Sequence, residues 1–138
     1  MSFGLSVGDF ITVLHLANTL RKQLVGAPGQ YSAVSQDVRT LSSILQDIED
    51  LIDNIGDGVA DRRKQELEQI SKACQAMLKE LETKLLQFQA LDSAGSKSGK
   101  FRVAWKKFRW DQEGVEEFRH RLNLHMTAFH TFLQCITK

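Results

Sequence analysis

The clearest pattern in the chain is a series of apolar residues between positions 31 and 55. They recur in alternating steps of three and four residues, which places them on one face of a helix. The series consists of Tyr31, Val34, Val38, Leu41, Leu45, Ile48, Ile52 and Ile55. Ile44 and Leu51 widen this face, so we expect the helix to contact more than one partner helix.

Three other segments repeat the helical spacing. The first, residues 6–24, opens with the capping-box spacing of Ser6 and Asp9 and stops before the turn residues 26–29. Its expected core face is Val7, Phe10, Leu14, Ala17, Leu20 and Leu24, widened by Ile11, Val13 and Leu16. Residues 60–91 form the third predicted helix, with an apolar face of Leu67, Ile70, Cys74, Met77, Leu81, Leu85 and Phe88. The last predicted helix carries Val115, Phe118, Leu122, Met126, Phe129, Leu133 and Ile136.

The links between the first three predicted helices are short. Short links place consecutive helices side by side in opposite directions. The pattern therefore predicts a single all-α domain, residues 1–138, folded as an antiparallel up-down four-helix bundle.

A basic and aromatic segment, residues 97–110, precedes the last helix. Its positive charges have no acidic residue among them, and they are Lys97, Lys100, Arg102, Lys106, Lys107 and Arg109. Phe101, Trp105 and Phe108 would share one face of a helix, so we expect a short extra amphipathic segment here. The C-terminal half of the second helix has the opposite sign, with an acidic run of Asp47, Glu49, Asp50 and Asp53.

Three interpretations of this basic segment are open. It could bind acidic lipid headgroups, with Trp105 and Trp110 at the interface. It could bind nucleic acid through phosphate contacts and stacking, which is least favoured because the rest of the chain offers no supporting basic surface. Its aromatic side chains could instead pack on the bundle, with the charges solvated or facing the acidic run. The candidate surface residues are Lys100, Arg102, Trp105, Lys106, Lys107, Arg109 and Trp110.

Composition and motifs narrow the function classes. The chain has 138 residues, 42% apolar and 25% charged, with a formal net charge of +1, as in an ordinary globular domain. Cys74 and Cys135 occupy apolar helical positions, which favours reduced, packed thiols in a cytosolic protein. The histidine spacing, the lack of HExxH and Cys-x-x-Cys, and the lack of a phosphate-binding glycine loop or nucleophile elbow predict no metal, cofactor or catalytic site. We do not expect an enzyme.

The N-terminal residues are unusually poor in charge. Asp9 is the only formal charge from position 3 to position 20. The Leu, Ile, Phe and Val residues there contribute about −0.3 to −0.6 kcal/mol each to membrane insertion, whereas a central Asp costs about 2.5–3.5 kcal/mol. The sum is near zero, so a single copy should stay packed, whereas several copies that shield Asp9 and His15 could insert. The membrane-insertion candidates are Phe3, Leu5, Val7, Phe10, Ile11 and Leu14.

Several stretches resemble the N-terminal domains of fungal STAND proteins, NLR-like receptors with a nucleotide-switch domain. They are SFGLSVGDF at residues 2–10, LANTLRK at 16–22, VRTLSSILQDIE at 38–49 and the segment WKKFRWDQEGVEEFRHRL. The chain is similar in this way to the HeLo-like group. Related HeLo domains, the four-helix domain of the mixed-lineage kinase-like pseudokinase and the coiled-coil domains of plant NLR receptors oligomerise and attack membranes. The acidic DIEDLID stretch also resembles the acidic motif of the plant domains.

The resemblance implies a signalling or cell-death effector domain, in innate immunity or heterokaryon incompatibility. The domain would self-associate on activation and reach a membrane through its first helix, residues 1–24. We expect it to be the N-terminal part of a larger receptor, cytoplasmic at rest and moving to the plasma membrane. Its expected partners are further copies of itself, membrane lipids and the other receptor domains. The alternative is an oligomerisation or adaptor module with no membrane activity.

Overall fold

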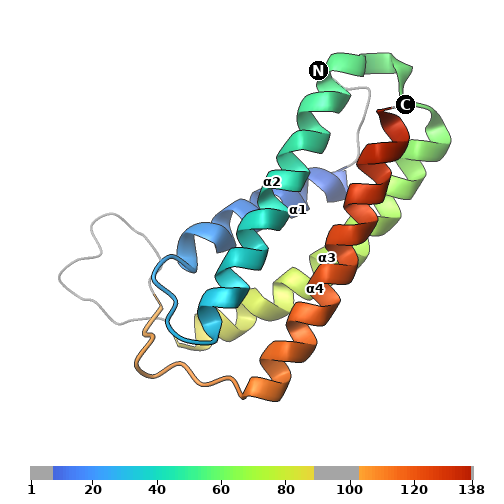
Figure 1. Cartoon of the computed structure of the whole chain (residues 1–138). Helices are drawn as coiled ribbons and strands as arrows, with labels where there is room; N and C mark the ends of the chain where they lie inside the picture. The colour runs from blue at the N-terminus through green and yellow to red at the C-terminus, as the bar shows by residue number, and fades with distance from the viewer. Residues whose placement is uncertain (1–7, 89–102, 138) are drawn as a thin grey trace, which may run out of the picture.

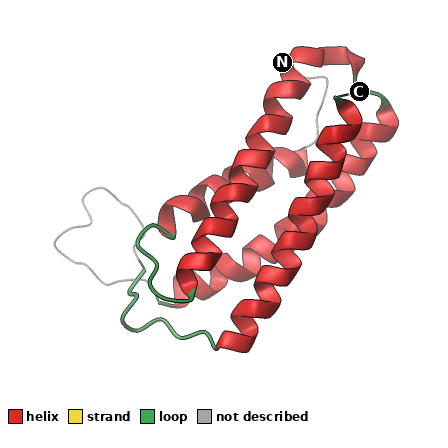
Figure 2. Cartoon of the chain, viewed as in Figure 1, coloured by secondary structure: helices red, strands yellow, loops and turns green. Residues whose placement is uncertain are grey.

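The computed structural model describes residues 8–88 and 103–137 of the chain. Four α-helices account for most of them: α1 (Gly8–Gln23), α2 (Tyr31–Ile55), α3 (Asp61–Gln87) and α4 (Gln112–Ile136). A short 3-10 helix, η1 (Gly56–Gly58), links α2 to α3. The predicted all-α four-helix bundle is confirmed (Figures 1 and 2).

The helices alternate in direction along the chain. α2 and α4 run one way, and α1 and α3 run the other way (Figure 1). Within the described residues, α1 and α4 each contact both α2 and α3, whereas α2 and α3 lie across the bundle diagonal from each other. The expectation that a short link places the second and third helices side by side is therefore wrong. The link through η1 therefore crosses one end of the bundle. Gly56 allows this sharp turn, because its φ of 65° is in the region that favours glycine.

The observed ends of the helices agree only in part with those predicted from the apolar spacing. The second helix has the predicted bounds, and α1 ends at Gln23, one residue before its predicted end, while residues 6 and 7 of the predicted start lie outside the described part. The predicted end of the third helix at position 91 is wrong, because Phe88 leaves the helical conformation with φ −117° and ψ 34°. Its carbonyl accepts a hydrogen bond from the Ala104 N–H at 2.7 Å, and its ring packs against Phe108 at 5.2 Å. Tertiary contacts thus end α3 earlier than its apolar spacing indicates.

Residues 103–110 do not form an α-helix. They make a turn in which the N–H groups of Lys107 and Phe108 donate to the Ala104 carbonyl at 2.9 and 3.0 Å. Trp105 and Phe108 therefore do not share a helical face, and Phe101 lies outside the described residues.

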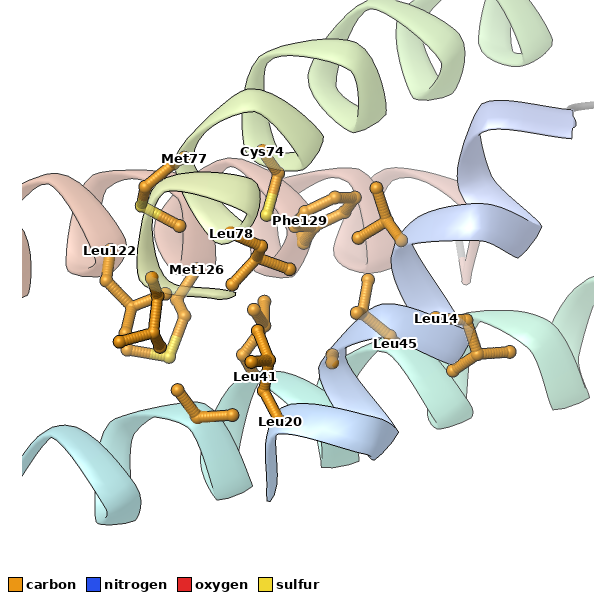
Figure 3. Close-up of a cluster of buried hydrophobic side chains, with 14 of the residues drawn as sticks. Leu14, Leu20, Leu41, Leu45, Cys74, Met77, Leu78, Leu122, Met126 and Phe129 are labelled. Carbon is orange, nitrogen blue, oxygen red and sulfur yellow. The ribbon is translucent and has the colours of Figure 1, made fainter. Parts of the chain in front are cut away.

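The core lies between all four helices. Figure 3 shows buried side chains that point toward one another, among them Leu14 and Leu20 of α1, Leu41 and Leu45 of α2, Leu78 of α3 and Phe129 of α4. Most predicted core positions are buried, but α4 buries Phe132 whereas Leu133 and Ile136 stay partly exposed. Cys74 is fully buried, as expected of a packed thiol, and burial raises its pKa to about 12.

Candidate functional site

The exposed side of α1 has no formal charge between Asp9 and Arg21. We call Ile11, Thr12, His15 and Thr19 the outer face of α1, and all four are exposed. The opposite side of the helix enters the core, where Phe10 and Leu14 are only 2% and 3% exposed. Of the membrane-insertion candidates in the described residues, only Ile11 is therefore accessible while α1 is docked. Phe3, Leu5 and Val7 lie outside the described residues.

Helix α1 is held mainly by apolar contacts. Its buried residues are Phe10, Val13, Leu14, Ala17 and Leu20, followed by Leu24 just beyond the helix. Among the described side chains, one hydrogen bond joins it to α2, in which the Ser42 hydroxyl donates to the Asn18 amide oxygen. Among the described residues, no ion pair connects α1 to another helix. Gln23 Oε1, in its last turn, is buried without a hydrogen-bond partner. The buried polar groups of α1 are therefore not all satisfied when the helix is docked.

Helix α4, by contrast, is tied by charge to both of its neighbours. Arg119 Nε contacts Asp37 Oδ2 of α2 at 2.7 Å, and the Arg121 guanidinium donates to both carboxylate oxygens of Glu80 of α3 at 3.0 and 2.8 Å. The hydrogen bond from Arg121 is the main cause that lowers the pKa of Glu80. The side chain of Asp111 caps the start of α4 by accepting from the Gly114 N–H at 3.2 Å.

At one end of the bundle, Trp110 connects three segments. Its backbone N–H donates to the Tyr31 hydroxyl, which in turn donates to the Trp110 carbonyl, both at 3.1 Å. The Gln30 amide donates to the same carbonyl at 3.1 Å, and Lys84 Nζ lies 5.3 Å from the Trp110 ring centroid. Gly114 allows the indole to approach α4, because an added Cβ there would lie 2.8 Å from Trp110 Nε1.

An aromatic cluster surrounds these contacts. Phe108 is 2% exposed, and its ring meets those of Tyr31 at 4.9 Å, Phe88 at 5.2 Å and Trp105 at 5.3 Å. The described aromatic side chains of the basic segment, Trp105, Phe108 and Trp110, thus pack on the bundle, as the third interpretation expected. The charged residues between them, Lys106, Lys107 and Arg109, are exposed. Lys100 and Arg102 lie outside the described residues.

Positive charges from three parts of the chain lie at this same end. We call this region the basic tip, and its members are Arg21, Lys22, Lys84, Lys106, Lys107 and Arg109. Figure 1 places the end of α1, the end of α3 and the turn before α4 together there. The sequence pattern predicts the third of these segments as a basic cluster, but it does not predict that the other two lie beside it, because their proximity follows from the helix directions.

The acidic run of α2 lies far from the basic tip. Asp47, Asp50 and Asp53 are exposed and Glu49 is half-buried. Tyr31, which contacts Trp110, is the first residue of α2, and Asp47 comes sixteen residues later, which is about 24 Å along a helix. For the described basic residues of the segment, Lys106, Lys107 and Arg109, the interpretation in which they face the acidic run of the same chain is therefore wrong.

The remaining described features give weaker indications of a functional site. A groove between α3 and α4 has a volume of about 400 Å³ and is lined by Arg63, Glu66, Gln69, Ile70, Ala128, Thr131, Phe132 and Cys135. Burial, with a smaller effect of Arg121, lowers the pKa of His125. The described residues hold no group of three or more His, Cys, Asp or Glu side chains suited to a metal ion. No described helix combines the length and apolar character needed to cross a membrane.

Comparison with known proteins gave no identification. No protein-family model, no curated protein and no solved structure matched the chain.

Proposed function

We propose that the chain is a signalling or cell-death effector domain that self-associates and acts on a membrane through its first helix. The observation that carries this proposal is the combination found in α1. Its outer face lacks formal charge, its inner face is apolar, and its described contacts with α2 and α3 include no ion pair. It is the described helix with the fewest polar contacts that would have to be broken before it moved.

Release of α1 needs a new apolar environment. Removing Phe10, Val13, Leu14, Leu20 and Leu24 from the core would cost about 8–15 kcal/mol if the helix stayed folded in water, at about 1.5–3 kcal/mol for each large side chain. That cost is comparable to the whole stability of a small domain. An undocked α1 is therefore stable only in a lipid interface or against other protein surfaces.

The same step supports self-association. When α1 leaves, the sides of α2 and α3 that it covered become exposed, including the region around Ser42. Large exposed apolar patches on a protein are normally covered by another molecule. Further copies of the chain, released in the same way, present complementary apolar surfaces. Undocking of α1 thus links membrane action to assembly.

A disulfide staple across the α1–α2 contact tests this function. Cysteines replacing Asn18 and Ser42 occupy positions whose side chains already meet. Cys135→Ser removes the half-buried thiol, and Cys74 is buried with a raised pKa, so it should not compete. The oxidised protein should leave lipid vesicles intact, whereas the reduced protein should release their contents and kill cells on expression. Formation of the staple is checked by mass, and folding by circular dichroism.

Exposed substitutions provide a matched control. Ile11→Glu places a charge on the outer face of α1, and Leu124→Glu places the same charge on α4, where the side chain is 58% exposed. Ile11→Glu should abolish vesicle leakage and cell killing, and Leu124→Glu should leave both unchanged. Oligomers that never release vesicle contents, whether stapled or not, would instead favour the oligomerisation or adaptor module. That alternative is supported by the burial of Phe10 and Leu14 in the closed bundle.

A further inference from the structure

We infer that the basic tip is a docking surface for an anionic membrane, used by the closed bundle before α1 moves. The inference rests on the proposed function in assuming that the chain works at a membrane, but it concerns a different part of the molecule. The tip joins the last turn of α1, the end of α3 and the turn before α4. Each lysine or arginine near an anionic lipid surface adds favourable binding energy.

The tip is held in place by its own contacts. Lys84 of α3 lies over the Trp110 ring, and Gln30 and Tyr31 at the start of α2 hydrogen-bond to the Trp110 backbone. The Arg109 guanidinium donates to the Lys106 and Phe108 carbonyls at 3.0 Å, which fixes the turn that carries the lysines. The backbone that carries these charges is therefore already held in one conformation, so docking should cost little conformational entropy.

Two exposed aliphatic side chains belong to the same ends of α1 and α3 that form the tip. Val25, directly after α1, is 67% exposed, and Leu86, near the end of α3, is 51% exposed. Basic residues next to exposed apolar ones are the combination that binds the interface of a lipid bilayer. Four acidic residues lie within four positions of these charges in the chain, Glu80, Glu82, Asp111 and Glu113, against the six basic residues of the tip.

Two features favour lipid over nucleic acid. Stacking on bases needs free aromatic faces, but Phe108 is buried and the rings of Tyr31, Trp105 and Trp110 contact one another or Phe108. The tip also gathers six basic residues, whereas the acidic run of α2 begins about 24 Å away from Tyr31 along the helix. This charge separation would orient the bundle with its tip on an anionic surface.

Tip docking differs geometrically from insertion of the N-terminus. The sixteen residues of α1 span about 24 Å, and the basic tip is at the C-terminal end of that helix. A bundle docked by its tip therefore keeps Gly8 away from the membrane. Docking and insertion are separate steps with separate residues.

Vesicle sedimentation tests the tip directly. The full chain should bind vesicles that contain phosphatidylserine and not vesicles of phosphatidylcholine alone. Lys106→Gln with Lys107→Gln should weaken partitioning about 30-fold, from about fivefold for each lysine near an anionic surface. The control, Arg62→Gln with Lys72→Gln, removes the same charge from exposed positions elsewhere on α3 and should change partitioning less than twofold. Val25→Ser should weaken it several-fold.

Intrinsic fluorescence gives the orientation. The chain has two tryptophans, Trp105 and Trp110, and both belong to the segment that forms the tip. Brominated anionic lipids should therefore quench the emission of the closed, stapled protein. Binding without quenching, or equal binding by the lysine variant and its control, would overturn the inference. So would tighter binding of single-stranded oligonucleotide at the same lysines, with displacement of the vesicles.

The two proposals fail in different ways. If the stapled protein docks but its reduced form never releases vesicle contents, the tip surface stands and the proposed action of α1 is wrong. If the reduced protein releases the contents of neutral vesicles and the tip variants do so equally well, α1 acts without docking and the tip inference is wrong.

Discussion

Helices α1 and α4 pack against the same two neighbours but are held there by different interactions. α4 combines a buried face with ion pairs to both α2 and α3 and with a capped N-terminus. α1 has a buried face and one described side-chain hydrogen bond to α2. Apolar contacts stabilise a helix wherever its face is covered, whereas ion pairs with defined geometry specify one partner. The described contacts therefore specify the position of α4 more strictly than that of α1, as the proposed movement of α1 requires.

The largest expected effect comes from truncating one buried aromatic ring in each helix. Phe10→Ala and Phe129→Ala should each lower the free energy of unfolding by about 3–5 kcal/mol, because both rings are almost fully buried. The pattern of loss should differ. In urea below the midpoint, Phe10→Ala should expose the amides of α1 to hydrogen exchange while α4 stays protected. Phe129→Ala should expose all four helices together.

Hydrogen exchange measured by mass spectrometry at several urea concentrations would check this pattern. The physical reason is that three helices remain linked by Arg119–Asp37, Arg121–Glu80 and the Trp110 contacts after α1 opens. Unfolding of α1 also regains backbone entropy, about 1–2 kcal/mol for each residue released. Simultaneous exchange of α1 and α4 in both variants would show that the comparison does not extend to local stability.

The sequence predicts that α1 and α4 are helices and which of their residues are buried, but it does not predict which helices they contact. The three-and-four spacing is enough to place Phe10, Leu14, Phe118 and Leu122 in the core, because burial depends on the helix's own periodicity. The placement of α1 beside α3 is set by the crossing of the α2–α3 link at Gly56, and no local pattern reports it. The basic tip follows the same rule. Lys106 and Lys107 form a cluster in the sequence, whereas the ends of α1 and α3, which carry Lys22 and Lys84 in their last turns, join it only through the tertiary fold.

Glycines near the starts of the two helices should respond with opposite signs. Gly114→Ala should lower the free energy of unfolding by about 1–3 kcal/mol, because the new Cβ would lie 2.7 Å from Asp111 Oδ1 and 2.8 Å from Trp110 Nε1. This clash outweighs the gain of up to about 1 kcal/mol in helix propensity. Gly8→Ala meets no atom within 4 Å, so it should stabilise α1 by a few tenths of a kcal/mol.

Urea unfolding at pH 7 measures both glycine effects. Near-ultraviolet circular dichroism provides the control, since displacement of the Trp110 indole should change the aromatic signal in Gly114→Ala and not in Gly8→Ala. A stabilising effect of Gly114→Ala with an unchanged aromatic signal would contradict the close approach of Trp110 to α4.

The smallest expected effect concerns the ion pair between α4 and α3. Arg121 and Glu80 have side chains 39% and 53% exposed, so solvent screening limits their contribution to about 0.2–1 kcal/mol. The pKa of Glu80 is lowered in the folded state, chiefly by its hydrogen bond with Arg121. The contribution is therefore present above the unfolded value of about 4.5 and is lost as the pH falls through the lower folded value. A double-mutant cycle of Arg121→Gln and Glu80→Gln at pH 7 should give a coupling energy in this range, and at pH 3 the coupling should be reduced. Added salt should weaken it at pH 7. A coupling that is absent at pH 7 and low salt would show that this pair does not hold α4 in place, and would leave Arg119–Asp37 as the tie that distinguishes α4 from α1.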